Sequence, residues 1–293
     1  MADPHPVCVG SCPVQDPSVI YGEDNRLEPY DSKNSPRHVV IARSTGALFN
    51  SRYIGIDRTN PANARIALVN YGNALNLCRE EPFREQPMGA GAFCSGFLVR
   101  RNVVATAGHC IQTPKDCEDA SFVFGFGYDK KAKDVGLVRS ADVYACKKII
   151  QSVSTETTDF ALIELDRMVV DREPIPFREK GKIEENAPLV VIGHPCQLPT
   201  KIAGGARVRS NSDDTSFVAN LDAFAGNSGS LVLNALTGIA EGILVSGETD
   251  FVERVLSEKP RKTCLVSRRC KDNKCKGETV TRSTEFAPFV PAK

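Results

Sequence analysis

The sequence has no tryptophan, only four histidines, and no surplus of either charge. Lys and Arg total 37 against 36 Asp and Glu, a formal net charge of +1, which excludes a nucleic-acid binder that works through a broadly basic surface. No apolar run reaches the ~18–20 residues that a membrane-spanning helix needs. A mainly disordered chain is also excluded, because 41% of the residues are hydrophobic. The 293 residues therefore form one large domain or two of roughly 100–150 residues each.

Eleven cysteines are present, yet none forms a C-x-x-C pair, which argues against zinc-ribbon and thioredoxin motifs. A cluster of His5, Cys8 and Cys12 lacks a nearby fourth ligand, so no metal is expected there. Disulfides formed in an oxidising compartment explain the cysteines more simply. The first residues show neither a charged segment nor an apolar core of a signal peptide, so we expect a secreted or periplasmic protein whose export signal is absent from this sequence.

Short apolar segments rich in Val, Ile and Phe, separated by Gly, Pro, Asp and Asn, predict many short strands. The expected strands are Phe93–Val99, Asn102–Thr106, Phe122–Phe126, Phe160–Leu165, Leu189–Ile192, Ser216–Leu221, Ser230–Leu233 and Ile239–Ser246. Long amphipathic helical patterns are absent from this region, so the pattern favours an all-β sandwich or barrel. A charged segment with two prolines, residues 166–182, divides the strands into two halves of comparable length.

Three polar residues stand at the edges of these strands. His109 lies in Ala-Thr-Ala-Gly-His-Cys after one strand, Asp159 opens another, and Ser228 lies in Gly-Asn-Ser-Gly-Ser. Each alone has a plain structural explanation, as a strand-end histidine, a capping acid and a loop serine. Glycines on both sides of a serine, however, allow a tight turn that exposes Oγ and aims backbone N–H groups at one point. The chain order His, Asp, Ser is one of the known orders of an acyl-transfer triad.

The combination resembles the trypsin/chymotrypsin-type serine endopeptidases over about residues 90–250. Cys-Ser-Gly-Phe-Leu-Val at 94–99, followed by Ala-Gly-His-Cys at 107–110, is similar to that family's pairing of a strand cysteine with the one beside the catalytic histidine. The resemblance therefore implies a Cys94–Cys110 disulfide. Gly-Asn-Ser-Gly-Ser at 226–230 and Ile-Tyr-Gly-Glu-Asp-Asn-Arg at 20–26 are similar to the bacterial, glutamyl-endopeptidase-like (V8-like) branch.

The resemblance implies a chymotrypsin-like fold, two packed six-stranded antiparallel β-barrels with the site in the cleft between them. We expect residues 1–17 to be a tail or pro-segment and residues 18–165 to hold an N-terminal extension plus the first barrel. The connector is then 166–182, and 183–293 holds the second barrel with a cysteine-containing C-terminal loop. The stretch before Cys94 is either the pro-segment of a zymogen or a wrapping of the barrels.

The same resemblance assigns roles to the residues of the site. Ser228 Oγ attacks the peptide carbonyl, His109 accepts and returns the proton, and Asp159 holds the histidine tautomer. The backbone N–H groups of Gly226 and Ser228 form the oxyanion hole. Because Asn227 is neutral, it cannot pair ionically with a new α-amino group, so trypsinogen-style activation is not expected. No metal or organic cofactor is needed.

Specificity depends on the residues around the nucleophile. Asp222 stands six residues before Ser228, where trypsins keep the acid of the primary pocket, so that carboxylate can pair with a substrate Arg or Lys. Alternatively, Asp222 only makes turn hydrogen bonds. A glutamyl preference is disfavoured, because the strand after the serine has no histidine and Ala223 takes the place of a hydroxyl residue. Ser246 and Gly247 are expected to border the pocket and bind substrate backbone as an added strand.

Two readings from other classes stay open. One is a chymotrypsin-fold binding protein without catalysis, although such proteins usually lack a triad residue. The other is a cytosolic all-β protein with free cysteines and a coincidental motif set. We read His5, His38 and His194 as structural or exposed. The expected partners are protein or peptide substrates, with no nucleic acid or membrane, and nothing demands more than a monomer.

Overall fold

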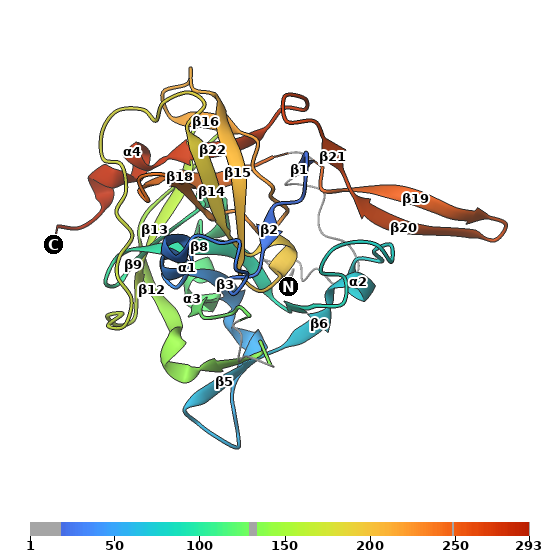
Figure 1. Ribbon diagram of the computed structural model, residues 1–293. Helices are drawn as coiled ribbons and strands as arrows, with labels where there is room; N and C mark the ends of the chain where they lie inside the picture. The colour runs from blue at the N-terminus through green and yellow to red at the C-terminus, as the bar shows by residue number, and fades with distance from the viewer. Residues whose placement is uncertain (1–18, 129–133, 248, 293) are drawn as a thin grey trace.

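The computed structural model describes residues 19–128, 134–247 and 249–292 of the chain. Their central feature is a pair of closed antiparallel barrels of six strands each (Figure 1), which confirms the expected all-β, chymotrypsin-like fold. The first barrel has the strand order β10-β12-β13-β9-β8-β3. Its strands are β3 (Thr45–Asn50), β8 (Ala92–Arg100), β9 (Val103–Thr106), β10 (Ala120–Phe124), β12 (Val143–Ser154) and β13 (Asp159–Leu165).

The second barrel follows the connector. Its order is β14-β17-β18-β22-β16-β15, and a pairing between β14 and β15 closes it. The strands are β14 (Pro188–Gly193), β15 (Lys201–Ser210), β16 (Ser216–Ala219), β17 (Leu231–Asn234), β18 (Ala240–Ser246) and β22 (Glu278–Arg282). Because both barrels are complete, each presents one set of strand ends at the boundary between them, where loops can carry functional residues.

Alternation of side chains explains how the barrels fill. In β12, Tyr144 and Cys146 are buried whereas Ala145 and Lys147 are exposed, the period of two that a strand imposes. The first barrel closes around aromatic rings, among them Phe122 and Phe124, which meet edge to face at 4.8 Å. The second closes mainly around smaller apolar side chains, including Val208, Leu244 and Val280, with Phe217 among them.

Residues 20–27 of the N-terminal extension pair with strands from the second half of the chain, whereas the sequence-based division groups residues 18–165 with the first barrel. Strand β1 (Ile20–Tyr21) runs parallel to β21 (Arg269–Cys270), and β2 (Arg26–Leu27) runs antiparallel to β15. The physical reason is apolar burial. Ile20 is fully buried in a cluster that also contains Leu198 and Phe224 from the second half of the chain.

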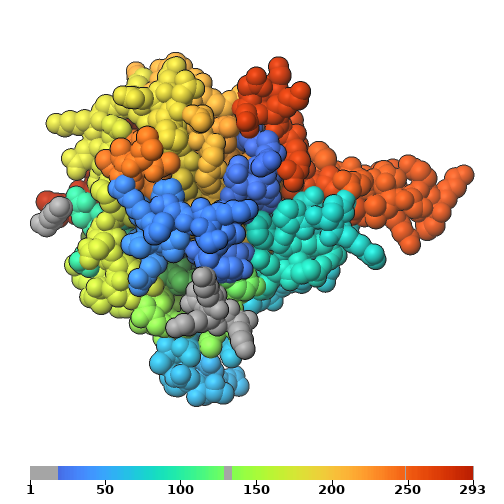
Figure 2. All heavy atoms as spheres, in the orientation of Figure 1, coloured from blue at the N-terminus to red at the C-terminus, as the bar shows by residue number. Residues whose placement is uncertain are grey.

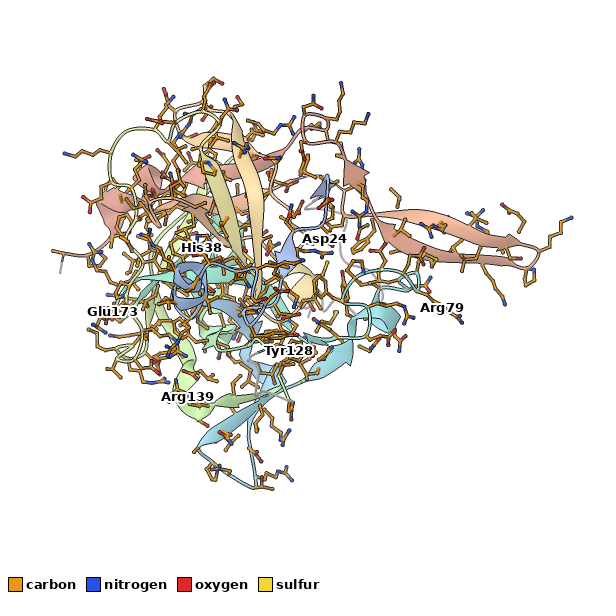
Figure 3. The ribbon with its side chains drawn as sticks, viewed as in Figure 1. Asp24, His38, Arg79, Tyr128, Arg139 and Glu173 are labelled. Carbon is orange, nitrogen blue, oxygen red and sulfur yellow. A yellow bond between two sulfur atoms is a disulfide. The ribbon has the colours of Figure 1, made fainter. Side chains whose placement is uncertain are left out.

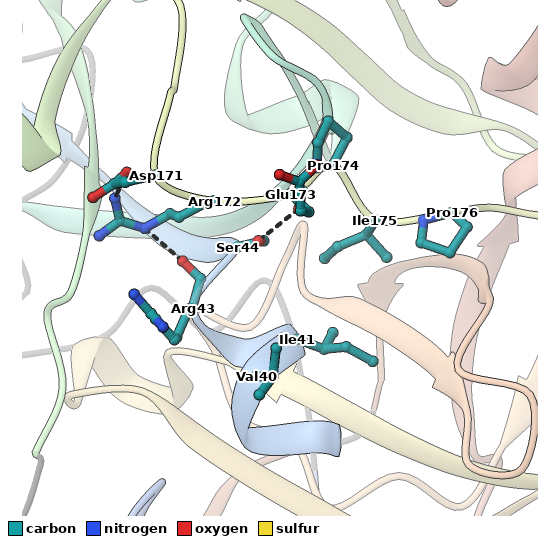
Figure 4. A pocket seen from close by; sticks show the side chains of 10 residues that line it. All are labelled: Val40, Ile41, Arg43, Ser44, Asp171, Arg172, Glu173, Pro174, Ile175 and Pro176. Atoms are coloured by element: carbon teal, nitrogen blue, oxygen red, sulfur yellow. Dashed lines mark hydrogen bonds and ion pairs between the residues drawn. The ribbon is translucent and has the colours of Figure 1, made fainter. Parts of the chain in front are cut away.

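The connector is held against the first barrel by polar contacts (Figure 4). The Ser44 hydroxyl donates to the Glu173 carbonyl at 2.7 Å, and the Arg172 guanidinium donates to the Arg43 carbonyl at 2.7 Å. Arg172 also pairs with Asp142 at 2.7 Å, and both side chains are almost fully buried. Residues 166–182 are thus a packed strap between the barrels.

Smaller elements decorate the barrels. The helices are α1 (Pro36–Ala42), α2 (Tyr71–Ala74), α3 (Pro114–Asp119) and α4 (Ser283–Phe286), with 3-10 turns η1 (Ser51–Tyr53), η2 (Gly108–Cys110), η3 (Ser140–Asp142), η4 (Pro195–Gln197) and η5 (Ala287–Phe289). The other strands are β4 (Ile54–Ile56), β5 (Asn63–Ile66), β6 (Leu68–Asn70), β7 (Pro87–Gly89), β11 (Leu137–Arg139), β19 (Phe251–Glu258) and β20 (Arg261–Ser267). The β19–β20 hairpin stands away from the body of the molecule (Figure 2).

Four disulfides join cysteines of the described residues: Cys78–Cys264, Cys94–Cys110, Cys117–Cys146 and Cys270–Cys275. The Cys94–Cys110 bridge is the one that the resemblance implied. Cys196 belongs to none of the four, and Cys8 and Cys12 lie outside the described residues. Across the described ranges, no helix combines the length and the apolar character that crossing a membrane requires.

Candidate active site

A histidine and an aspartate form the polar centre at the end of the first barrel. The two carboxylate oxygens of Asp159 have different partners. Oδ2 lies 2.5 Å from His109 Nδ1. Oδ1 accepts hydrogen bonds from the backbone N–H groups of Gly108 and His109, at 2.5 and 3.0 Å. Antiparallel pairing of β13 with β9 brings the start of one strand to the end of the other, which places the pair together. A side chain at Gly108 would collide with the Val153 carbonyl, so only glycine fits this close approach.

A contact from the second barrel reaches the same acid. The backbone N–H of Asp159 lies 3.4 Å from the Thr281 hydroxyl of β22. A hollow of about 400 Å³ opens beside the pair, and its walls include His109, Asp159, Ser246 and Thr281. The predicted pocket residue Ser246 therefore faces the same hollow as His109. Thr281 carries no pattern in the sequence, and sequence reasoning missed it.

The loop that carries Ser228 docks against strand β8 of the first barrel. The Ser95 N–H donates to the Ser228 carbonyl at 2.8 Å, and the Gly229 N–H donates to the Leu244 carbonyl at 2.8 Å. Gly229 has φ +87°, and a Cβ there would overlap the Ser95 carbonyl. Ser95 follows Cys94, whose sulfur lies within 4.8 Å of a His109 ring nitrogen. The disulfide and this docking bring the loop that carries Ser228 to the end of the barrel that holds His109.

The turn before Ser228 is tight and has a glycine in the left-handed conformation. Gly226 has φ +86°, and the Asn227 N–H donates to the Phe224 carbonyl at 3.0 Å, which closes a tight turn around Ala225 and Gly226. Asn227 is buried, and its side-chain oxygen accepts the Ser230 hydroxyl at 3.0 Å. The Gly-Asn-Ser-Gly-Ser segment is therefore stabilised by its own hydrogen bonds as well as by those to β8.

Asp222 lies at the N-terminal extension, where its oxygens accept the backbone N–H groups of Tyr21 and Asn25 at 2.8 Å each. These bonds reach across the chain to the N-terminal extension, so they differ from the turn hydrogen bonds that the sequence offered as the alternative to a pocket acid. Burial raises the pKa of Asp222 to about 7, against the two N–H groups, which lower it. The neighbouring Asp24 (Figure 3) pairs instead with Arg26 at 2.6 Å. Gly247 follows the end of β18 directly after Ser246.

The remaining histidines differ from His109. His38, on α1, is half-buried with Nε2 3.4 Å from the Ala235 carbonyl. His194 is buried, its ring stacks on Phe126 at 5.6 Å, and burial lowers its pKa to about 4. His5, with the cysteines proposed beside it, lies outside the described residues. The Cys94, Cys110 and His109 cluster has no thiolates to offer a metal, because the two sulfurs are joined.

Comparison with known proteins places this arrangement in a family. The model of the trypsin-like peptidase domain matches residues 94–243. The fold is similar to that of the VesB protease of Vibrio cholerae, with a TM-score of 0.52, 16% identity and coverage of 93% of this chain and 66% of that one. A Glu endopeptidase gives a TM-score of 0.50 at 14% identity, with 93% of this chain and 97% of that one covered.

Human heparin binding protein also shares the fold, with a TM-score of 0.50 at 14% identity and coverage of 92% of this chain and 95% of that one. No curated protein sequence matches the chain. Identities this low establish the fold alone, whereas the family model spans about half of the chain, including His109, Asp159 and Ser228. The chain therefore belongs to the trypsin-like peptidase family and is a serine endopeptidase.

Proposed function

We propose that the protein hydrolyses peptide bonds through Ser228, His109 and Asp159. The observation that carries the proposal is the hydrogen bond of 2.5 Å between His109 Nδ1 and Asp159 Oδ2, with the second Asp159 oxygen fixed by two backbone N–H groups. This geometry keeps the proton on Nδ1 and leaves Nε2 as the base, the tautomer that a serine nucleophile requires.

The reaction runs through an acyl-enzyme. Ser228 Oγ attacks the carbonyl carbon while His109 takes the hydroxyl proton, and the histidine then gives that proton to the leaving amine. Water repeats the sequence to release the new carboxyl group. The N–H groups of Gly226 and Ser228 stabilise the oxyanion in both halves, and one such donor is typically worth ~10²–10³ in rate.

For primary specificity we propose cleavage after Arg or Lys. The two backbone N–H groups use only about two of the roughly four acceptor positions of the Asp222 carboxylate. Arg26 lies near enough to lower the pKa of Asp222, but its guanidinium pairs with Asp24 at 2.6 Å, so a substrate guanidinium or ammonium would pair with Asp222 directly. In this proposal the N-terminal extension holds the Asp222 carboxylate in place through Tyr21 and Asn25. A preference for Glu, as in the Glu endopeptidase of similar fold, is the competing proposal.

We further propose that the enzyme acts outside the cytosol, in a secretory or periplasmic environment. Four disulfides among the described residues favour an oxidising compartment. The V8-like resemblance of residues 20–26 and 226–230 supports a place in the bacterial branch of the family.

Cut-site mapping on a diverse peptide mixture, read by mass spectrometry, tests these proposals. Ser228→Ala should lose about 10⁶ in kcat, as nucleophile removal does in comparable triads, and Ser140→Ala, a surface serine, should keep full activity. Cuts after Arg and Lys that vanish in Ser228→Ala support both nucleophile and pocket. Cuts after Glu keep the nucleophile and overturn the pocket proposal, while equal activity in Ser228→Ala and the natural chain overturns the mechanism.

A further inference from the structure

Two carbonyl groups of the turn that carries the oxyanion hole, those of Ala225 and Gly226, accept hydrogen bonds from other segments. The Ala225 carbonyl accepts the Cys196 N–H at 2.6 Å, and the Gly226 carbonyl accepts the Ser95 hydroxyl at 3.0 Å. A trans peptide group is planar, with its C=O and N–H pointing in opposite directions. Because the Ala225 carbonyl is turned toward Cys196, the N–H of Gly226 is turned away from it, and only this second direction can serve an oxyanion hole.

Ser95 connects three parts of the site. It belongs to β8 of the first barrel and is 0% exposed. Its N–H holds the Ser228 carbonyl, and its hydroxyl donates to Gly226 while accepting the backbone N–H of His194 at 3.0 Å. The Ser95 hydroxyl therefore contacts both the turn at Gly226 and the segment that begins at His194, which binds the same turn through Cys196.

That second segment, His194–Leu198, is itself held in one shape. Cys196 and Gln197 both adopt positive φ angles, +47° and +62°, and the Gln197 N–H returns to the His194 carbonyl at 3.1 Å. The His194 ring contacts the Leu198 carbonyl through Nδ1 at 3.1 Å and stacks on Phe126. Two consecutive left-handed residues that are not glycine persist only when their surroundings impose them.

Asn227 shows why such a grip is needed. Its side chain is neutral and engaged with the Ser230 hydroxyl, so it offers no carboxylate to an α-ammonium group. We propose that Ser95 is a positioning residue for catalysis: its hydroxyl, acting with the His194–Leu198 turn, holds the Gly226 N–H in the oxyanion-hole orientation, with no ion pair to an α-amino group. The inference rests on the proposed role of Ser228 and adds the element that keeps its site assembled.

The proposal predicts a loss confined to the transition state. Ser95→Ala leaves the Gly226 carbonyl and the His194 N–H without their buried partner, so the turn can rotate its peptide away from the reactive orientation. Complete loss of one oxyanion donor costs ~10²–10³ in kcat, and partial misorientation should cost about 10–100-fold. KM should stay within about twofold, because the ground-state carbonyl depends little on the hole.

The matched control is Ser283→Ala. Ser283 is also 0% exposed and also donates its hydroxyl to a backbone carbonyl, that of Arg178 at 2.7 Å, but it lies on α4. Both variants should lose similar thermal stability, and only Ser95→Ala should lose kcat. Affinity for a peptide aldehyde, whose adduct oxygen occupies the hole, should fall in parallel with kcat, while affinity for the corresponding peptide alcohol should not change.

Three results overturn the proposal: equal kcat in the two variants, a loss in Ser95→Ala that falls on KM alone, or aldehyde and alcohol affinities that fall together. Ser95→Thr, which keeps the hydroxyl, should regain most of the kcat, and it replaces Ser95→Ala as the test variant if that chain does not fold. In that case a Ser95→Thr enzyme with unchanged aldehyde affinity supports the proposal, and one that binds aldehyde tenfold more weakly while folding fully overturns it.

The proposal also states that the oxyanion hole needs no ion pair with an α-amino group. Carbamylation of that group near pH 7, where it reacts ahead of the lysines, tests this statement. Activity within twofold of the untreated full chain is expected, and a tenfold loss overturns this part. Ser228→Ala separates the two levels of the argument. If it stays active, the proposed function fails and the positioning role with it. An inactive Ser228→Ala beside a fully active Ser95→Ala overturns the positioning role alone.

Discussion

Asp159 and Asp222 have almost the same hydrogen bonds and entirely different surroundings. Each accepts two backbone N–H groups, from Gly108 and His109 in one case and from Tyr21 and Asn25 in the other. Asp159 also meets an imidazole and lies at the hollow between the barrels, with its side chain 16% exposed. Asp222 is 4% exposed against the N-terminal extension.

The difference shows that backbone N–H groups fix where a carboxylate points, whereas its third partner decides what it does. The third partner of Asp159 is the imidazole of His109, the base of the proposed proton transfer. Asp222 has only burial added to its two N–H groups, and its pKa is raised to about 7. Asp222 is therefore ionised when a cation lies beside it or when the pH rises above about 7.

Removing the charge of Asp159 should have the largest effect. In Asp159→Asn the amide N–H₂ group can face Nδ1 and reverse the histidine tautomer, which leaves Nε2 protonated and unable to act as a base. We expect kcat to fall about 10⁴-fold, with little change in KM. Stopped assays on a peptide cut by the natural enzyme measure both constants.

Asp166→Asn is the control, because Asp166 is an exposed acid that pairs with Arg167 just past the opposite end of β13. Its kcat should stay within twofold. If kcat falls less than tenfold in Asp159→Asn, Asp159 does not take part in catalysis. Asp159 and Asp222 would then have the same role, that of binding backbone N–H groups.

Asp222→Ala should give a smaller effect in two readouts. The variant leaves the N–H groups of Tyr21 and Asn25 buried without acceptors, so we expect a loss of about 2–3 kcal/mol in the free energy of unfolding. Cleavage after Arg and Lys should fall about 10–100-fold in kcat/KM, the value of one charge-assisted hydrogen bond. Denaturant unfolding near pH 5 and kinetics on paired peptides provide the measurements.

Asp213→Ala is the stability control, since Asp213 also accepts two backbone N–H groups, of Thr215 and Ser216, but in an exposed loop. It should cost under about 1 kcal/mol, because water replaces the lost acceptor. If Asp222→Ala is destabilised with unchanged preference for Arg and Lys, Asp222 is an anchor only and the acid of the pocket must be sought elsewhere.

The sequence predicts best those parts whose residues carry a pattern. Apolar runs predict β8, β13 and β18 within a few residues. It misses β12, where exposed lysines interrupt the run, and β15, which contains two glycines, because their stability comes from pairing with neighbouring strands.

The same rule holds in the site. His109, Asp159 and Ser228 stand in short segments whose composition indicates chemistry. Ser95 and Thr281 are ordinary strand residues until the barrels close around them, since contacts of Ser95 reach 131 positions along the chain. The anchoring of Asp222 was likewise beyond the sequence, because its partners lie 197 and 201 positions away.

The smallest effect concerns His194, whose segment contacts the proposed oxyanion-hole turn, and it is a change of stability at acidic pH. Its pKa is lowered to about 4 in the folded chain by burial, against about 6.5 in the unfolded chain. The unfolded chain therefore binds the proton first as the pH falls. The contribution of His194 to stability is complete above about pH 6.5 and is lost as the pH falls toward 4, by about 2 kcal/mol between pH 7 and pH 5.

Asp222 works in the opposite direction over the same range. Its folded pKa is raised, so the unfolded chain loses its proton first, and stability falls by about 2 kcal/mol as the pH rises from 5 to 7. These two contributions nearly cancel in the natural chain. His194→Phe, which keeps a ring beside Phe126, should therefore become more stable at pH 5 than at pH 7, and Asp222→Ala should become less stable there. Parallel pH curves for the two variants in denaturant unfolding would show that neither group titrates where its burial places it.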